Sequence, residues 1–214
     1  MAALLLLGAG GHARVVAETA LATGRFSRIA FLDDRCTGPA QLPDQLGWPV
    51  IGPFAAALDP HIRQKFSAAL VAIGNATLRL QWSPRLAAAG YELPVVIHPT
   101  AWVSPSAQLG AGSVVFAQAA IQAQAVIGRG AILNTGCSVD HDAQLGDGVH
   151  ICPGARLAGE VQVGNRSWIG IGASVIQQIR IGADVTVGAG AAVVVDLPEG
   201  ATAVGVPARV LPTT

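Results

Sequence analysis

The second half of the chain places an aliphatic residue at every sixth position. Seventeen successive positions in steps of six, from Ile97 to Val193, are all Ile, Leu or Val. Four residues after each of these, twelve of the seventeen positions hold Ala, Ser or Cys, and one residue after, nine of the seventeen hold Gly, Asn or Asp. An α-helix repeats near 3.6 residues and a simple strand near two, so this period predicts short strands joined by tight corners.

Three such hexads make one triangular coil, and successive coils stack at about 4.8 Å, the ordinary spacing of paired strands. In this arrangement the aliphatic side chain points inward and the small residue occupies a crowded position. The Gly, Asn or Asp that follows the aliphatic residue is expected at a corner with positive φ. A disordered segment is excluded because the apolar positions are too regular.

The first half has a different pattern, in which apolar runs alternate with a helical stretch. Residues 3–8 form an apolar run that ends in glycine, as expected of a strand buried on both faces of a parallel sheet. The segment GAGGHA (residues 8–13) follows, then a helix from Arg14 to about Thr23, a strand at residues 28–32 and another at residues 69–73. The loops therefore lie at the carboxyl ends of parallel strands, where α/β folds bind ligands.

The glycine-rich segment has the spacing of a dinucleotide-binding loop. Gly8, Gly10 and Ala13 fit the pattern G-x-G-x-x-[GA], and an acidic pair follows about twenty residues later. Only about three strands precede the hexads, which is half of a dinucleotide fold, so a single nucleotide is expected in place of NAD. Taken alone, the motif fits equally well a phosphate-binding loop at a helix N-terminus or a tight turn without ligand.

Composition excludes several classes of protein. Thirteen basic and thirteen acidic residues cancel in this 214-residue chain, and only 12% of residues are charged, so no nucleic-acid or anionic-membrane partner is expected. The early apolar run, residues 2–7, is far shorter than the roughly 20 residues of a membrane-spanning helix and lacks the features of a signal peptide. Three cysteines without metal-like spacing predict free thiols and a cytoplasmic location.

The hexads at residues 97–198 resemble the hexapeptide-repeat acyltransferases, and the segment GVPAR (residues 205–209) is similar to their C-terminal motif. This resemblance implies a left-handed parallel β-helix, a homotrimer, and acyl-CoA bound in the groove between neighbouring helices. The order GAGGHA, FLDD, IGN and IHPTAWVSPSA before the hexads resembles the bacterial sugar O/N-acyltransferases of glycan biosynthesis. We therefore expect a half-Rossmann-like α/β domain (residues 1–92), a β-helix domain (residues 93–198) and a C-terminal tail (residues 199–214).

In the UDP-amino-sugar enzymes of that family, the N-terminal loops hold the uridine diphosphate. The resemblance carries this role to six positions here: Gly10, Gly11, His12, Asp33, Asp34 and Gly74.

Transfer of an acyl group to an amine needs a general base, and histidine beside a carboxylate is the usual one near neutral pH. The segment ILNTGCSVDHD (residues 132–142) resembles the catalytic coil of the family, which identifies His141 as the base and Asp142 as its acidic neighbour. Asn134 is expected to contact the histidine. Stacking of positions eighteen residues apart places His141 between Ala123 and Gly159, which leaves space for an incoming amine.

Four further positions match acetyl-CoA contacts of the family: His150, Ile171, Gly172 and Ala189. The stacking neighbours of His150 are Ile132 and Trp168, an apolar setting that suits a thioester. Cys137 and Cys152 are interpreted as packing residues.

These features together predict an acetyl-CoA-dependent N-acetyltransferase of a nucleotide-linked amino sugar, with the UDP-4-amino-sugar class favoured and no metal. Within the enzyme class, the alternative is O-acetylation of a sialic acid or another sugar. A zinc carbonic anhydrase on the same helix needs three histidines, and only His141 and His150 are available here. A nucleotide-binding scaffold without activity does not account for the open setting of His141.

Overall fold

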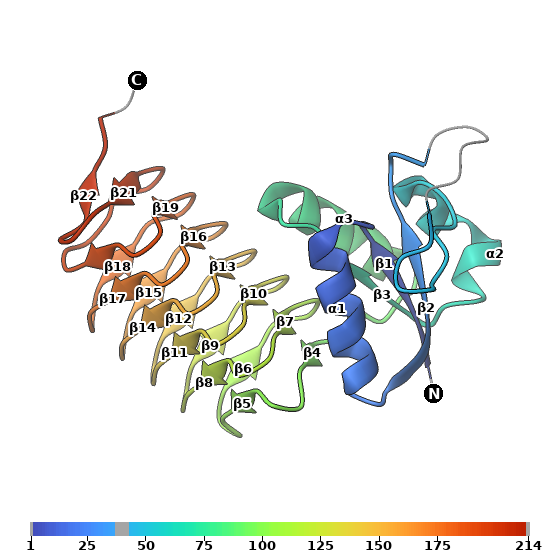
Figure 1. Ribbon diagram of the computed structural model, residues 1–214, viewed down its shortest axis with the longest axis horizontal. Coiled ribbons are helices and arrows are strands. Elements are labelled where there is room, and N and C mark those ends of the chain that lie inside the picture. The colour runs from blue at the N-terminus through green and yellow to red at the C-terminus, as the bar shows by residue number, and fades with distance from the viewer. Residues whose placement is uncertain (1, 37–42, 213–214) are drawn as a thin grey trace. The chain divides into compact units, whose positions relative to one another are not determined.

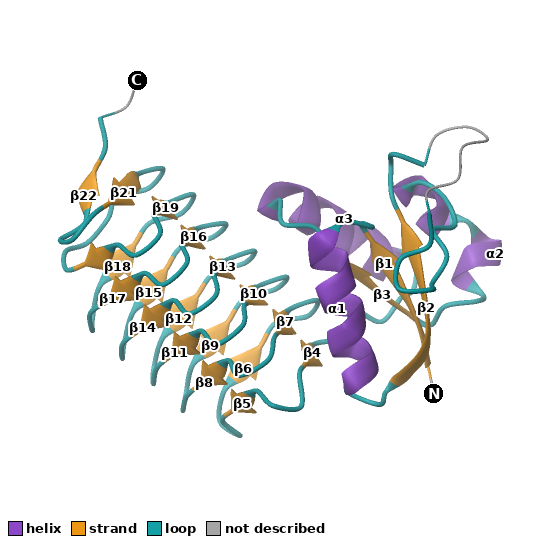
Figure 2. Cartoon of the chain, in the orientation of Figure 1, coloured by secondary structure: helices purple, strands orange, loops and turns teal. Residues whose placement is uncertain are grey.

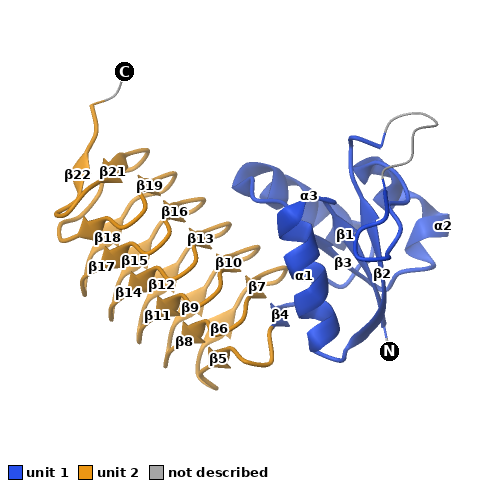
Figure 3. Cartoon of the chain, in the orientation of Figure 1, with its two compact units in different colours: residues 1–97 blue, residues 98–214 orange. Residues whose placement is uncertain are grey.

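The computed structural model describes residues 2–36 and 43–212 of the chain. These residues form two units, residues 1–97 and residues 98–214 (Figures 1 and 3). The division falls where the α/β pattern of the sequence gives way to uninterrupted hexads.

The first unit contains a three-stranded parallel sheet with the order β2-β1-β3. Its elements in chain order are β1 (Ala2–Leu7), α1 (Gly11–Ala22), β2 (Phe26–Leu32), the 3₁₀ helix η1 (Phe54–Leu58), α2 (Pro60–Arg63), β3 (Ala68–Val71), α3 (Ala76–Ala88) and β4 (Val96–Ile97). The strand-loop-helix-strand order expected from the sequence is confirmed. Helix α1 begins at Gly11, earlier than the expected Arg14, because Gly10 already serves as its N-cap.

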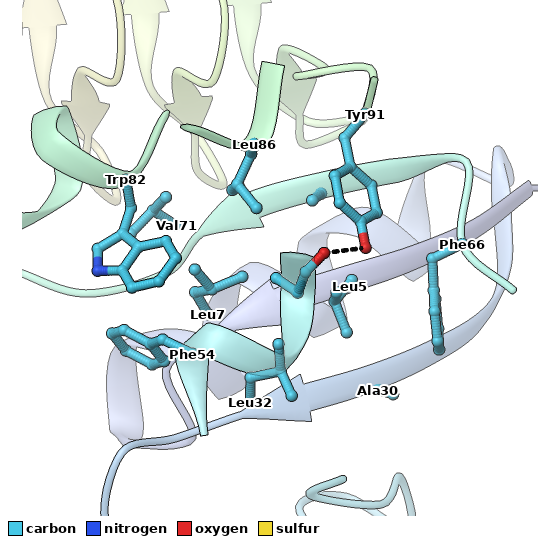
Figure 4. Packing of buried hydrophobic residues seen from close by; sticks show 12 residues of the cluster. Leu5, Leu7, Ala30, Leu32, Phe54, Phe66, Val71, Trp82, Leu86 and Tyr91 are labelled. Atoms are coloured by element: carbon cyan, nitrogen blue, oxygen red, sulfur yellow. Dashed lines mark hydrogen bonds between the residues drawn. The ribbon is translucent and has the colours of Figure 1, made fainter. Parts of the chain in front are cut away.

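The central strand of this sheet is buried on both faces, as its apolar run predicts. Leu4, Leu5, Leu6 and Leu7 have no exposed surface. Leu5 and Leu7 belong to a core cluster that also includes Phe54, Trp82 and Tyr91 (Figure 4). The hydroxyl of Tyr91 donates a hydrogen bond of 2.8 Å to the Ala57 carbonyl, so the aromatic ring enters this core without an unpaired polar atom.

The second unit is a left-handed parallel β-helix, and the hexad prediction is confirmed strand by strand. Each of the seventeen aliphatic positions is the second residue of a two-residue strand, from β4 to β20. The strands of this unit are β5 (Trp102–Val103), β6 (Gln108–Leu109), β7 (Val114–Val115), β8 (Ala120–Ile121), β9 (Val126–Ile127), β10 (Ile132–Leu133), β11 (Ser138–Val139), β12 (Gln144–Leu145), β13 (His150–Ile151), β14 (Arg156–Leu157), β15 (Gln162–Val163), β16 (Trp168–Ile169), β17 (Ser174–Val175), β18 (Arg180–Ile181), β19 (Thr186–Val187), β20 (Ala192–Val193), β21 (Thr202–Val204) and β22 (Arg209–Val210).

These strands form three faces that run along the helix (Figure 2). Within this unit, face 1 has the order β22-β21-β19-β16-β13-β10-β7, face 2 has β20-β17-β14-β11-β8-β5, and face 3 has β18-β15-β12-β9-β6. Strands that are neighbours in a face come from successive coils. Each strand therefore pairs with the strand three places before it and the strand three places after it in the chain. Residues eighteen apart lie side by side, as Ile132, His150 and Trp168 do on face 1.

The corner glycines have a different role from the one that the sequence suggested. The positions directly after the aliphatic residue, expected at positive φ, have ordinary φ values. Positive φ occurs two residues later, for example at Gln124 and Gly136. The glycines after the aliphatic residue are required by close approach instead, because an added Cβ on Gly128 would lie 2.5 Å from the carbonyl carbon of Gly146 in the next coil.

Residues 199–214, expected as a tail, contribute two strands within the described chain. Strand β21 pairs in parallel with β19 and so extends face 1, and β22 returns antiparallel to β21. Gly205, with a φ of 97°, lies in the reversal between them. Among the helices of residues 2–36 and 43–212, none is long and apolar enough to cross a membrane.

Candidate active site

Five of the six predicted nucleotide-binding residues lie close to the carboxyl end of a strand in the first unit. Gly10 is the N-cap of α1 and Gly11 is its first residue, shortly after β1, whereas Asp33 and Asp34 follow β2 and Gly74 follows β3. His12 is in the first turn of α1. Because β2-β1-β3 is a parallel sheet, these carboxyl ends share one edge, and the structure brings the whole set together there.

Glycine keeps the surface of this edge open. An added Cβ on Gly10 or Gly74 would meet no atom within 4 Å, and at Gly11 it would meet only a side-chain nitrogen of Arg14 at 3.8 Å. None of the three has positive φ. By contrast, Gly8 has a φ of 116°, and a Cβ there would lie 2.7 Å from the Ala72 carbonyl oxygen. Gly8 is therefore needed for the fold, whereas the other three leave room above the loops.

The two aspartates are both engaged by the protein itself. Asp33 accepts hydrogen bonds from the backbone N–H of Ala9 at 2.9 Å and from the guanidinium of Arg35 at 2.8 and 2.9 Å. Arg35 is the main cause that lowers the pKa of Asp33 to about 2. Asp34 accepts the backbone N–H of Phe54 at 2.8 Å and so anchors η1. Asp33 thus ties the glycine loop to the end of β2.

Arg79 is a residue that the sequence reasoning missed. Its side chain is 2% exposed and donates hydrogen bonds to the carbonyls of Ile73 at 2.8 Å and Gly74 at 3.1 Å. The buried guanidinium therefore holds the backbone of the loop after β3 in place. From sequence alone, an arginine on an amphipathic helix is expected to face solvent. The one signal that Arg79 faces the loop is its position four residues after the N-cap Asn75.

His12 is partly buried, and its pKa is lowered to about 4. Burial is the larger cause, and the positive charge of Arg79 is the second. The imidazole is therefore neutral near neutral pH. It lies in the first turn of a helix whose N-cap, Gly10, provides no side-chain hydrogen bond to the N-terminal N–H groups. Such a helix start is suited to a phosphate group.

In the second unit, His141 and Asp142 lie in the corner between β11 and β12, where face 2 meets face 3. Asp142 accepts a hydrogen bond of 2.8 Å from Nδ1 of His141, and Asp140 accepts the backbone N–H of His141 at 2.8 Å. Because a carboxylate can only accept, Nδ1 carries the proton and Nε2 is the nitrogen with a free lone pair. The imidazole is 54% exposed.

The surroundings of His141 favour the protonated imidazole. Its pKa is raised, first by the hydrogen bond to Asp142 and further by the negative charges of Asp140 and Glu160. A raised pKa makes Nε2 a stronger base than a free histidine. The predicted stacking neighbours are also found, because Asp142 N–H bonds the Ala123 carbonyl and Glu160 N–H bonds the His141 carbonyl.

Asn134 and His150 belong to a second group of side chains. The amide nitrogen of Asn134 lies 3.2 Å from Nε2 of His150, whereas the sequence suggested that Asn134 contacts His141. The His150 ring is parallel to Trp168, with a centroid distance of 5.6 Å and an angle of 4°. The indole N–H of Trp168 points to the sulfur of Cys152. Sequence reasoning placed Trp168 only as a neighbour, but it extends the exposed flat surface beside His150.

The predicted acetyl-CoA residues continue this second group along one edge. Ile171, Gly172 and Ala189 lie in the corners between face 1 and face 2, and the Gly190 N–H bonds the Ile171 carbonyl from the next coil. Ile171 is 60% exposed. The His141–Asp142 pair therefore occupies one edge of the triangular helix, and the predicted acetyl-CoA residues occupy another. Face 2 lies between these two edges.

The His141 side chain in the first group and the Trp168 and Ile171 side chains in the second are exposed. A groove of about 780 Å³ on face 3 is lined instead by residues such as Gln144, Gln162 and Arg180. A second groove, of about 410 Å³, lies beside β2 around Trp48 and Phe66.

Other side chains do not suggest different chemistry. Burial raises the pKa of Cys137 to about 12 and that of Cys152 to about 11, so both are protonated thiols packed in the helix, as expected. Within residues 2–36 and 43–212, no three His, Cys, Asp or Glu side chains come together as metal ligands.

A hexad β-helix that carries an exposed histidine–aspartate pair, joined to an α/β unit with an open glycine loop, defines the class of hexapeptide-repeat acyltransferases. Residues 3–86 match the PglD N-terminal domain. The chain is 46% identical to the acetyltransferase domain of PglB from Neisseria gonorrhoeae in complex with acetyl coenzyme A, with a TM-score of 0.91 and 98% of each chain covered. The chain therefore belongs to the family of acetyl-CoA-dependent sugar N-acetyltransferases.

Two further relatives fit this family. The H141N mutant of perosamine N-acetyltransferase from Caulobacter crescentus, in complex with CoA and GDP-perosamine, is 42% identical, with a TM-score of 0.92, covering 100% of this chain and 98% of that one. The UDP-N-acetylbacillosamine N-acetyltransferase of Bacillus subtilis is 38% identical over 122 residues, 52% of this chain. That match spans 50% of the Bacillus protein, so this chain covers about half its length.

The lowered pKa of His12 predicts a pH-dependent stability of the first unit. Between pH 6.5 and about 4 the unfolded chain binds a proton at His12 that the folded chain does not bind, so stability falls as pH falls through this range. The full effect is at most about 3 kcal/mol. Urea unfolding of the wild type should show this loss, and His12→Asn should flatten it. The exposed His61, changed to Asn, is the matched control and should leave the slope unchanged; an unchanged slope in His12→Asn would contradict the assignment.

Proposed function

We propose that this protein transfers the acetyl group of acetyl-CoA to the amine of a nucleotide-linked 4-amino sugar, with His141 as the general base. The observation that carries the proposal is the His141–Asp142 pair, which leaves Nε2 exposed and basic on a β-helix of the sugar N-acetyltransferase family. The UDP-linked class is favoured by the Bacillus relative, which by its name acts on a UDP-linked sugar.

The nucleotide end of the substrate is assigned to the glycine edge of the first unit. The N-cap Gly10 gives no side-chain hydrogen bond to the first N–H groups of α1, and a Cβ on Gly10 or Gly74 would meet no atom within 4 Å, so these donors suit a diphosphate. His12 lies in the first turn of the same helix, and its lowered pKa keeps it neutral near neutral pH, so it adds no charge there. Asp33 and Arg79 act indirectly. Asp33 holds the glycine loop through the Ala9 N–H, and Arg79 holds the loop after β3 through the Ile73 carbonyl.

At the reacting end, His141 takes a proton from the amine as the nitrogen attacks the acetyl carbonyl. The new N–C bond forms as the C–S bond breaks, and the proton held on Nε2 is then available to the departing CoA sulfur. Asp142 keeps the proton on Nδ1 and stabilises the imidazolium during this step. Acetyl-CoA supplies the acyl group as a thioester, so no acyl-enzyme intermediate is required.

The surface assigned to acetyl-CoA is the edge that carries His150, Trp168, Ile171 and Ala189. Its exposed apolar side chains and parallel rings suit the acyl and pantetheine parts of the cosubstrate. The Caulobacter relative, which is 42% identical, carries its H141N substitution at the same residue number as His141 here. That mutant is in complex with both CoA and GDP-perosamine. Binding in that relative therefore survives loss of the histidine, as expected of a base that acts during proton transfer.

The two edges can act on one substrate if they come from different copies of the chain. Within one triangular helix, face 1 with His150 lies opposite the corner of His141. We therefore place each active site between neighbouring copies of a homotrimer, in which one copy contributes His141 and the next contributes His150. A neighbouring copy would also cover the open edge and exclude water.

The substrate class is tested by measuring CoA release with UDP-, GDP- and dTDP-linked 4-amino sugars, each paired with its 4-hydroxy counterpart. We expect release only with amino sugars, and fastest with the UDP-linked one. The 4-hydroxy sugars are the matched controls, since they differ only in the attacking atom. Release with hydroxy sugars alone would replace the proposal with O-acetylation, and release with neither set would refute sugar acetylation.

Substitution of the base should affect turnover and leave binding intact. His141→Ala should lower kcat by roughly 10²- to 10⁴-fold, the usual contribution of general acid–base catalysis. Asp142→Asn should cost less and should move the acidic limb of the pH–rate profile to lower pH, because the carboxylate is what raises the pKa of His141. His150→Ala should instead raise the KM for acetyl-CoA. Full activity of His141→Ala together with loss of activity in His150→Ala would assign the base to the other histidine.

The shared site is tested by mixing two impaired variants, assayed at an acetyl-CoA concentration well below the raised KM of His150→Ala, where each variant alone has little activity. When His141→Ala and His150→Ala chains with different tags are co-expressed and purified as mixed trimers, random assembly restores about one quarter of the sites. This follows because each site then has an intact His141 half of the time and an intact neighbouring His150 half of the time. If both histidines served one site within a single copy, mixing would restore none, and the proposal of a shared site would fail.

A further inference from the structure

One row of corner positions on the β-helix contains a single glycine. Positions eighteen residues apart lie in successive coils as far as β20, and the row through His141 consists of Pro105, Ala123, His141, Gly159 and Gln177. Every member except Gly159 has a β-carbon. The corner itself therefore accepts side chains, and the glycine needs a separate explanation.

Backbone conformation does not supply that explanation. Gly159 is absent from the positive-φ glycines of the described chain, whereas Gly154 and Gly172 in nearby corners have φ values of 67° and 65°. An L-amino acid could adopt the backbone of Gly159 without strain. Close approach to the next coil, which explains Gly128, does not explain it either, because the nearest atoms to a Cβ on Gly159 all belong to His141.

The imidazole of His141 occupies the space that a side chain at residue 159 would need. An added Cβ would lie 2.5 Å from both Cε1 and Nε2 and 3.2 Å from Cδ2 of the ring. The backbones cannot separate to relieve this contact, because Glu160 N–H bonds the His141 carbonyl at 2.9 Å and Gln178 N–H bonds the Gly159 carbonyl at 3.0 Å. The ring is instead free to move, since it is half exposed.

We infer that Gly159 is a positioning residue, which seats the His141 imidazole so that Nε2 faces the amine while Nδ1 bonds Asp142. A methyl group at residue 159 would push the ring by about 1 Å to reach ordinary contact distance. A shift of this size carries Nδ1 out of its 2.8 Å hydrogen bond with Asp142. The catalytic consequence rests on the proposed role of His141 as the base. The packing of the His141 ring against Gly159, which we call the seat, does not depend on that role.

The test is Gly159→Ala in the full-length protein. We expect kcat to fall on the order of 10²-fold, because a misplacement of about 1 Å has this effect on a catalytic group. The KM values for acetyl-CoA and the nucleotide sugar should stay within about twofold, since a positioning role gives the glycine no contact with either substrate. In NMR titrations, the pKa of His141 should fall toward its ordinary value of 6.5, because the bond to Asp142 is the main cause of its elevation.

A matched control separates the seat from a general packing effect. In a His141→Ala background the ring is gone, so adding Gly159→Ala should leave the melting temperature and the oligomeric state unchanged. If the methyl group lowers the melting temperature equally with and without the imidazole, it clashes with the coil, and the inference fails. Wild-type kcat and an unchanged His141 titration in Gly159→Ala would also overturn it.

The proposed function and this inference fail separately. If His141→Ala retains full activity, His141 is not the base, but the NMR titration of Gly159→Ala still reports whether the glycine seats the ring. If His141→Ala is inactive and Gly159→Ala titrates and turns over like the wild type, the base assignment stands and the seat does not.

Discussion

The fixed register between coils is the constraint on which this structure depends. Each short strand bonds the equivalent strand of the coils on either side, as when His150 N–H donates to the Ser167 carbonyl at 3.0 Å and Asp140 N–H to the Leu157 carbonyl at 3.0 Å. A side chain therefore has predetermined neighbours eighteen residues before and after it. Insertion of a single residue would move every later aliphatic position out of the core, which is why the hexads run unbroken.

This register also determines what a β-helix can use as an active site. Within the described β-helix the corners are short, and its side chains lie in rows along straight edges. His141 lies on one edge, and His150 with Ile171 lies beside another. Under the proposed function, a second helix beside the first would bring these two rows together. In that arrangement the surfaces that leave the rows open would also provide the contact for a neighbour.

Much of this arrangement could be predicted from the sequence, because the repeat converts sequence separation into spatial distance. The hexads predicted the strands from β4 to β20 and the neighbours of His141 and His150, but not β21 and β22, which lie in the expected tail. They could not give the direction in which a side chain turns at a corner, so Asn134 was placed beside the wrong histidine. The role of the corner glycines was also misassigned, since close approach and positive φ both favour glycine and only coordinates separate them.

The first unit was less predictable, because its site depends on packing between distant segments. The order of strands and the convergence of their loops followed from the alternation of apolar runs and helices. The burial of Arg79 did not, because nothing local distinguishes a guanidinium that faces a loop from one that faces water. Its hydrogen bonds to two loop carbonyls become visible only when α3 is packed on the sheet.

The two histidines assigned to the site are perturbed in opposite directions, and this has a mechanistic consequence. His12 is kept neutral down to about pH 4 by burial and by Arg79, while the pKa of His141 is raised by the carboxylates around it. His12 therefore does not gain a proton in the range where His141 does. Under the proposed function the acidic limb of the turnover profile is assigned to His141, so a change in that limb reports on its surroundings: Asp142, the charges of Asp140 and Glu160, and the glycine against which the ring packs.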